Sequence, residues 1–246
     1  MTAAVADRPA RTPNRTLTVV RMQLINRQTF LWLPLIILLS SFAISLAIYG
    51  IIAYTVGDDG RDPIYGGGSQ APLWYFAAVG VQALTLSFPF SQAVSATRRE
   101  FYLGTLLTAA LSALGLSLIY LIGGLIEKAT DGWGFDGYFF YLPWIWDQGP
   151  AVATLLFFVV SMFAFMLGFW AATIYKRFGM LGVILTIVGI LLALVVAAVA
   201  ITGSRTWTGV GRWLAGVEPL TVCGIVVLVA VVLGGASYLT LRRTSP

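Results

Sequence analysis

Long apolar runs alternate with short polar segments along almost the whole chain. An apolar run must reach about 20 residues to cross the hydrocarbon core of a bilayer as a helix. Six segments reach that length, at approximately 31–55, 73–95, 103–126, 151–175, 179–202 and 220–240. The pattern therefore predicts an all-α membrane protein, with six transmembrane helices in a single domain over residues 15–246 and no separate soluble domain.

Prolines mark several of the predicted helix ends. Pro72, Pro150 and Pro219 each stand just ahead of an apolar run, where a missing backbone N–H is tolerated and the fixed φ suits the first turn of a helix. Pro89 lies inside the second predicted span instead, so we expect it to kink or end that helix.

The chain before the first span divides into two parts. Residues 1–14 fit a flexible, solvated cytoplasmic arm. In residues 15–30, Leu17, Val20 and Leu24 recur at helical spacing, while Gln23 lies mostly off that face. This pattern predicts an amphipathic helix in the inner membrane interface, whose arginines lie among anionic headgroups. These arginines are Arg15, Arg21 and Arg27, of which Arg21 falls close to the apolar face.

Charge is scarce and unevenly distributed. Charged residues make up 10% of the chain, with 15 Lys and Arg against 10 Asp and Glu. When loops are assigned alternately to the two sides, eleven basic residues fall on the side of the termini and four on the other. Eight acids, Glu127 among them, fall on that other side. Basic loops stay in the cytoplasm, so both termini are expected inside.

Composition argues against two classes of function. The chain has no histidine and one cysteine, Cys223, and its acids lack a metal-ligand spacing, so we expect no catalytic site and no cofactor or metal bound by this chain. The six apolar segments contain no ionisable Asp, Glu, Lys, Arg or His, although ion-coupled carriers place such groups within the membrane. A transporter built in this way would take its energy from another subunit.

The segment "SATRREFYLGTLL", 95–107, joins the second and third predicted spans on the inner side. Paired arginines beside aromatic residues are typical of a topological anchor at the membrane edge. The same combination suits a short helix that docks in a groove of a soluble partner. Together with "YKRFGMLG" at 175–182, the segment resembles the permease subunits of bacterial ATP-binding-cassette exporters of the type-2 family.

The resemblance implies a partner assembly in the bacterial cytoplasmic membrane. Two cytoplasmic ATPase subunits would bind ATP and Mg, and a second permease chain would complete a homodimer or a heterodimer. The cargo would be an amphiphilic or hydrophobic drug, peptide or lipid, and export is the direction that the family implies. The loop residues implied to contact the ATPase are Thr97, Arg98, Arg99, Glu100, Phe101 and Tyr102, with Lys176, Arg177 and Phe178 as a second contact.

Two further groups of residues are candidates for a role in transport. The segment 131–149 holds eight aromatic residues, which fit an interfacial segment at the outer leaflet or a lid that contacts an amphiphilic cargo; Trp133, Phe135, Tyr138, Trp144 and Trp146 represent it. In the second span one helical face carries Gln82, Thr85, Pro89 and Gln92. These residues either hydrogen-bond to neighbouring helices or line a pathway between two permease chains.

Two alternatives from other classes remain. A stand-alone channel or secondary carrier would work without ATP or a partner. A non-transporting membrane sensor or anchor would bind its partner and move no cargo. In every case the bilayer is the surrounding medium, and no feature of the sequence indicates nucleic-acid binding.

Overall fold

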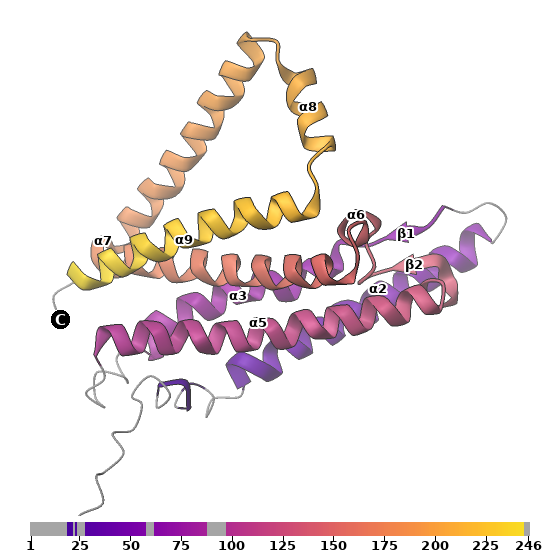
Figure 1. Cartoon of the computed structure of the whole chain (residues 1–246), viewed down its shortest axis with the longest axis horizontal. Coiled ribbons are helices and arrows are strands. Elements are labelled where there is room, and N and C mark those ends of the chain that lie inside the picture. The colour runs from indigo at the N-terminus through magenta and orange to yellow at the C-terminus, as the bar shows by residue number, and fades with distance from the viewer. Residues whose placement is uncertain (1–18, 22, 24–27, 58–61, 88–96, 244–246) are drawn as a thin grey trace, which may run out of the picture.

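The computed structural model describes residues 19–21, 23, 28–57, 62–87 and 97–243. These residues are mostly helical (Figure 1). The longer helices are α2 (Leu33–Val56), α3 (Ala71–Gln82), α5 (Arg98–Ala129), α7 (Pro150–Gly203), α8 (Trp207–Ala215) and α9 (Pro219–Arg243). The shorter elements are η1 (Gln28–Trp32), β1 (Ile64–Tyr65), η2 (Gly67–Gln70), η3 (Ala83–Ser87), η4 (Gly132–Asp136), β2 (Gly137–Tyr138) and α6 (Pro143–Trp146).

Four of the described helices are long and apolar enough to cross a membrane: Gln28–Val56, Arg98–Ala129, Pro150–Gly203 and Pro219–Thr240. They agree with a multi-pass membrane protein. The number of spans, the side of the termini and the flexible arm at 1–14 remain predictions, because the second predicted span is described only as far as Ser87 and the arm lies outside the described residues.

The 54-residue helix α7 contains both the fourth and the fifth predicted spans. Its backbone leaves the helical region at Gly179, where φ is 69° and ψ is −167°. A positive φ of this kind is readily adopted only by glycine. The kink divides α7 into a first half, 150–178, and a second half, 180–203, which correspond to the two predicted spans.

Prolines begin the helices as predicted. Pro72 lies in the first turn of α3, and Pro150 and Pro219 are the first residues of α7 and α9. Pro34 has the same position in α2. The predicted kink at Pro89 lies outside the described residues.

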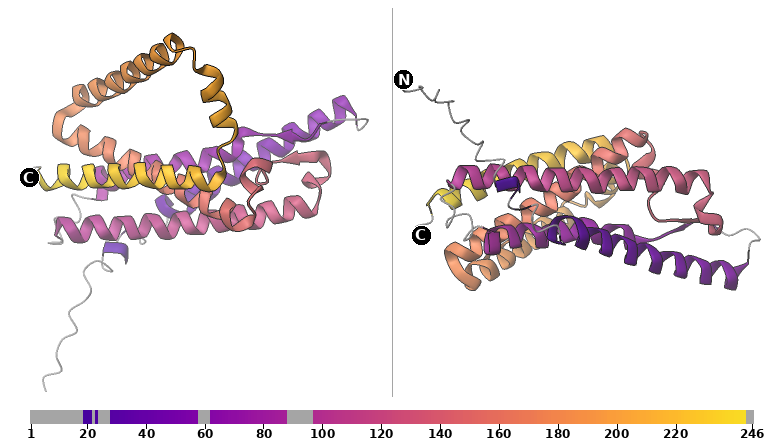
Figure 2. Two further views of the ribbon diagram at one scale, coloured as in Figure 1. Left: turned by 45° about the horizontal axis from the view of Figure 1, so that its top comes forward. Right: turned by 90° about the horizontal axis from the view of Figure 1, so that it is seen from below.

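The first half of α7 is the centre of a helical bundle. Helix α7 packs against α3, α5 and α9, and α2 packs on α3. All buried residues of α7 lie between Ala153 and Thr173. The second half leaves the bundle, and α8 leads the chain back to the start of α9 (Figures 1 and 2). The large apolar side chains in this second half of α7 are mostly exposed; Met180 near its start is 65% exposed and Val199 near its end is 66% exposed.

Two glycines allow α3 and α7 to cross at backbone contact. A Cβ placed on Gly80 would lie 2.1 Å from the carbonyl oxygen of Phe165, and one placed on Gly168 would lie 1.9 Å from that of Ala77. Small residues permit such close approach between membrane helices. Because the obstructing atoms are backbone atoms, a larger residue at either position would have to separate the helices.

Replacing Gly168 by valine should therefore destabilise the bundle by about 3 kcal/mol or more. The measurement is the temperature at which the detergent-solubilised protein loses its monodisperse gel-filtration peak. Gly224→Val in α9 is the matched control, because a Cβ at Gly224 would meet no atom within 4 Å. Equal transition temperatures for the two variants would show that the α3–α7 crossing is not needed for stability.

Candidate functional site

The sequence "TRRE" begins helix α5. The Thr97 N–H donates to Glu100 Oε2 at 2.9 Å, and the Glu100 N–H donates to Thr97 Oγ1 at 3.3 Å. This reciprocal pair is a capping box, which satisfies two backbone donors at the start of a helix. It places Arg98 and Arg99 in the first turn of α5, so from Thr97 onward the expected docking segment is part of a long helix.

The two aromatic residues that follow have structural contacts. Phe101 is 0% exposed in the core. The Tyr102 hydroxyl donates to the Gly234 carbonyl oxygen of α9 at 2.9 Å, and the Tyr102 ring packs on Phe169 and Tyr238. These side chains join α5 to α7 and α9, and Phe101 has no surface to offer a second chain. Of the predicted ATPase contacts in this segment, Phe101 is therefore not accessible in this fold, and a contact through Thr97, Arg98, Arg99, Glu100 and Tyr102 stays a prediction.

The second predicted contact lies at the kink of α7. Lys176, Arg177 and Phe178 are exposed immediately before Gly179. The Arg177 guanidinium lies 5.0 Å from the centroid of the Phe178 ring, a cation–π geometry. In Figures 1 and 2 the kink, the start of α5 and the end of α9 lie at the same end of the bundle. The two basic clusters, although distant in sequence, thus share what we call the basic end.

Part of the predicted amphipathic helix packs on α5. Val19, Val20 and Gln23 are buried, and Arg21 is exposed. Both polar residues depart from the predicted faces: Gln23 was expected off the apolar face and Arg21 close to it. For Gln23 the reason is a hydrogen bond of 2.6 Å from Nε2 to Thr105 Oγ1 of α5, which satisfies the buried NH2 group, whereas the buried Oε1 has no hydrogen-bond partner in the described part of the chain. Arg15 and Arg27 lie outside the described residues.

The candidate pathway residues are only partly described. Gln82 ends α3 and Thr85 lies in η3, and both are half-buried. The Thr85 hydroxyl donates to the Val81 carbonyl oxygen at 2.9 Å, so it is satisfied by its own helix. Pro89 and Gln92 lie outside the described residues. A role of this face in a transport pathway stays a prediction.

At the other end of α5, the carboxylate of Glu127 is fully buried. Its Oε1 accepts hydrogen bonds from Trp133 Nε1 and the Phe139 N–H, both at 2.8 Å. Its Oε2 accepts from the N–H groups of Phe140 at 2.6 Å and Tyr141 at 2.7 Å. A buried charge is tolerated when it is fully hydrogen-bonded in this way.

The aromatic segment 131–149, which we call the outer cap, is folded around this carboxylate. Strand β2 of the cap pairs in parallel with β1, with Ile64 opposite Gly137 and Tyr65 opposite Tyr138. The Phe42 ring of α2 packs against the rings of Trp133, Phe139 and Phe140. The cap therefore joins the end of α5 to the middle part of α2.

The backbone of the cap is strained near its start. Asp131, Trp133 and Asp136 have φ values of 46°, 63° and 52°, in the left-handed region that such residues rarely adopt. A Cβ on Gly132 would lie 2.6 Å from the Gly137 nitrogen, so only glycine fits there. Such conformations persist where the surrounding contacts determine them, and for Trp133 the hydrogen bond from its Nε1 to Glu127 Oε1 is one such contact.

The five aromatic candidates of the cap differ in exposure. Trp146 is buried, and its Nε1 donates to the Phe140 carbonyl oxygen at 3.1 Å. Trp133 and Tyr138 are half-buried, while Phe135 and Trp144 are exposed. Burial and the nearby carboxylates of Asp136 and Asp131 raise the pKa of Tyr138 above its ordinary value, so its hydroxyl stays protonated at neutral pH.

The cap is also joined to the start of α9. Trp144 Nε1 donates to the Val217 carbonyl oxygen at 3.1 Å. Gln148 Oε1 accepts from the Leu220 N–H at 3.0 Å, and Gln148 Nε2 donates to Glu218 at 2.7 Å. Sequence reasoning counted Glu127 only among the outer acids and did not single out Gln148. One sequence feature could have indicated the buried carboxylate of Glu127: an isolated acid at the end of an apolar helix, followed by a segment rich in glycine and aromatic residues.

Comparisons of the chain with protein-family models, with curated proteins and with solved structures found no match.

Replacing Glu127 by glutamine should loosen the outer cap. The amide has one acceptor oxygen and an NH2 group that would face N–H donors, so about two hydrogen bonds are lost, at a cost of about 2–4 kcal/mol. Chymotrypsin, which cleaves after aromatic residues, should then cut between 133 and 146 at least tenfold faster in the folded protein.

The matched control is Glu218→Gln at the other outer glutamate, whose side chain is bonded to Gln148 at an exposed site. That variant should keep the slow cleavage rate. Equal cleavage rates in Glu127→Gln and the wild-type protein would show that the carboxylate does not hold the cap.

Proposed function

We propose that this chain is the membrane subunit of an ATP-binding-cassette transporter, which pairs with a second permease chain and two cytoplasmic ATPase subunits to export an amphiphilic or hydrophobic compound. The observation that carries the proposal is the basic end. Arg98 and Arg99 in the first turn of α5 lie at the same end of the bundle as Lys176 and Arg177 at the kink of α7. The apolar segments between these clusters carry no ionisable group, which favours an external source of energy.

Helix α5 offers a direct mechanical route through the membrane. It is continuous over 32 residues, about 48 Å at 1.5 Å per residue. Its first turn carries the arginines of the basic end, and Glu127 near its last turn holds the outer cap. A displacement of the first turn by a bound ATPase would therefore reach the cap through one rigid helix, and reach α9 through the bond of Tyr102 to Gly234.

The second half of α7 supports a partner within the membrane. Its apolar side chains are exposed along its length, and it does not pack on the rest of the described bundle. A second permease chain or lipid would cover this surface. In the proposed assembly a second permease chain covers it, either an identical chain in a homodimer or a related chain in a heterodimer.

Reversing both charges in the variant Arg98→Glu/Arg99→Glu should weaken binding of the ATPase at least tenfold, because like charges at an interface cost several kcal/mol. The variant should still fold, since acidic side chains are favourable at a helix N-terminus. The measurements are co-purification with a candidate ABC ATPase subunit expressed together with the chain and the rate of ATP hydrolysis.

The matched control reverses Arg205 and Arg212, two basic residues beyond the kink and outside the basic end. It should leave ATPase binding unchanged. An ATPase that binds equally well to both double variants would refute the coupling role of the basic end.

The two alternative functions give different results in the same preparation. Purified chain that moves a solute into liposomes without the ATPase would support a channel or secondary carrier. An ATPase that binds and hydrolyses ATP while no compound moves would support a sensor or anchor.

A further inference from the structure

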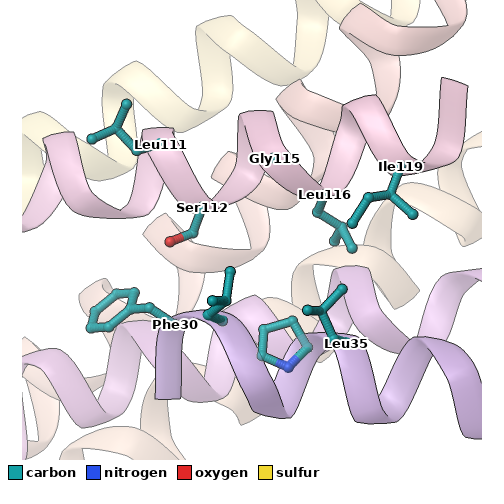
Figure 3. Close-up of a pocket in the computed structure, with 9 residues that line it drawn as sticks. Phe30, Leu35, Leu111, Ser112, Gly115, Leu116 and Ile119 are labelled. Atoms are coloured by element: carbon teal, nitrogen blue, oxygen red, sulfur yellow. The ribbon is translucent and has the colours of Figure 1, made fainter. Parts of the chain in front are cut away.

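Helices α2 and α5 enclose a groove in the middle of the bundle's length. Helix α5 contacts η1, which precedes α2, and the outer cap joins the end of α5 to Phe42 in the middle part of α2. Between these points a groove of about 440 Å³ remains (Figure 3). Its volume is within the range of sites for drug-sized ligands.

The walls of the groove are almost entirely apolar. Phe30, Leu35, Leu116 and Ile119 contribute apolar side chains. Gly115 leaves space on the side of α5, because a Cβ placed there would meet no atom within 4 Å. The side chains that line the groove carry no charge.

Ser112 is the exception to this apolar lining. Its hydroxyl points from α5 into the space between the two helices (Figure 3). The other hydroxyls along this stretch of α5 are in use: Thr105 accepts from Gln23, and Thr108 and Ser117 donate to carbonyl oxygens of their own helix at 2.9 Å. Among the described residues, the Ser112 hydroxyl has no hydrogen-bond partner. It is therefore available to a bound molecule.

The depth of Ser112 restricts what that molecule can be. Ser112 is 14 residues from Arg98 and 17 from Ala129 at the ends of α5, about 21 Å and about 26 Å along the helix. It thus lies near the middle of a hydrocarbon core of about 30 Å. A phospholipid keeps its polar groups at the membrane surface, so its acyl chains would offer Ser112 no acceptor.

We propose that the groove between α2 and α5 binds a neutral, mostly apolar small molecule that accepts a hydrogen bond from Ser112. A charged ligand would be left without a counter-charge at this depth. The site is formed within one chain and requires neither ATP nor a partner. It goes beyond the proposed function, and binding can fail or succeed independently of transport.

Benzophenone is a suitable probe, because it is neutral, has one carbonyl acceptor and crosslinks to C–H bonds on irradiation. We expect irradiation of the full-length chain in nanodiscs of phosphatidylethanolamine and phosphatidylglycerol to label residues 30–35 and 111–119 preferentially, as mapped by mass spectrometry. Gly115→Leu adds a side chain at a wall of the groove where a Cβ would meet no atom within 4 Å, and it should remove most of this labelling. Ser112→Ala should weaken it about fivefold, the effect of one hydrogen bond.

Matched variants separate these effects from general damage. Gly224→Leu adds the same side chain where a Cβ meets no atom within 4 Å, and Ser40→Ala removes a hydroxyl that is bonded to the Ile37 carbonyl oxygen. Both should keep wild-type labelling. Diphenylmethane, which lacks the carbonyl, should compete about fivefold less well than unlabelled benzophenone in the wild type, and this preference should vanish in Ser112→Ala.

Benzophenone could instead label residues in proportion to their exposure to lipid. The second half of α7 would then be labelled as strongly as the groove, and this result would overturn the proposal. Labelling that survives Gly115→Leu would also overturn it. Equal labelling of Ser112→Ala and wild type would refute the role of the hydroxyl and with it the ligand class.

Discussion

The buried carboxylate of Glu127 determines how the outer end of the molecule is built. A charge removed from water is costly unless hydrogen bonds replace its hydration. Three backbone N–H groups and one indole N–H replace that hydration here. Because those donors belong to the outer cap, α5 and the cap cannot separate without leaving a bare charge. Trp133, whose φ is positive, is held by the same carboxylate through its indole N–H.

A glutamate side chain stabilises each end of α5, but the two glutamates accept hydrogen bonds from donors beyond opposite ends of the helix. At the basic end Glu100 satisfies a backbone donor before the helix begins. At the other end Glu127 satisfies donors that lie beyond the helix in sequence. The helix between them is fixed to its neighbours by Phe101 and Tyr102 near one end and by Tyr120 near the other, where the Tyr120 hydroxyl donates to the Ser69 carbonyl oxygen.

Features with a local physical cause could be predicted from the sequence, and features that depend on distant partners could not. The lengths of the apolar runs and the charges at Lys176 and Arg177 located the boundary between the fourth and fifth predicted spans, which is the kink within α7. The prolines located the starts of several helices. The segment around Thr97 was interpreted as a docking motif, but its capping box also explains the pattern. Gln23 and Glu127 are buried because of partners far along the chain or in an irregular loop, and periodicity carries no information on such partners. Helix α8 was not predicted because nine residues fall below the length that an apolar run makes evident.

The crossing of α3 and α7 at Gly80 and Gly168 limits how the bundle can rearrange. Interlocked backbones resist sliding along the helix axes, whereas rotation about the contact point keeps the same atoms together. Gly168 lies 10 residues from Phe178, at the basic end, and 18 from Pro150, beside the outer cap. These arms are about 15 Å and about 27 Å. If the first half of α7 tilts as a rigid rod about this crossing, a movement at the basic end is reversed in direction and nearly doubled in amplitude beneath the cap.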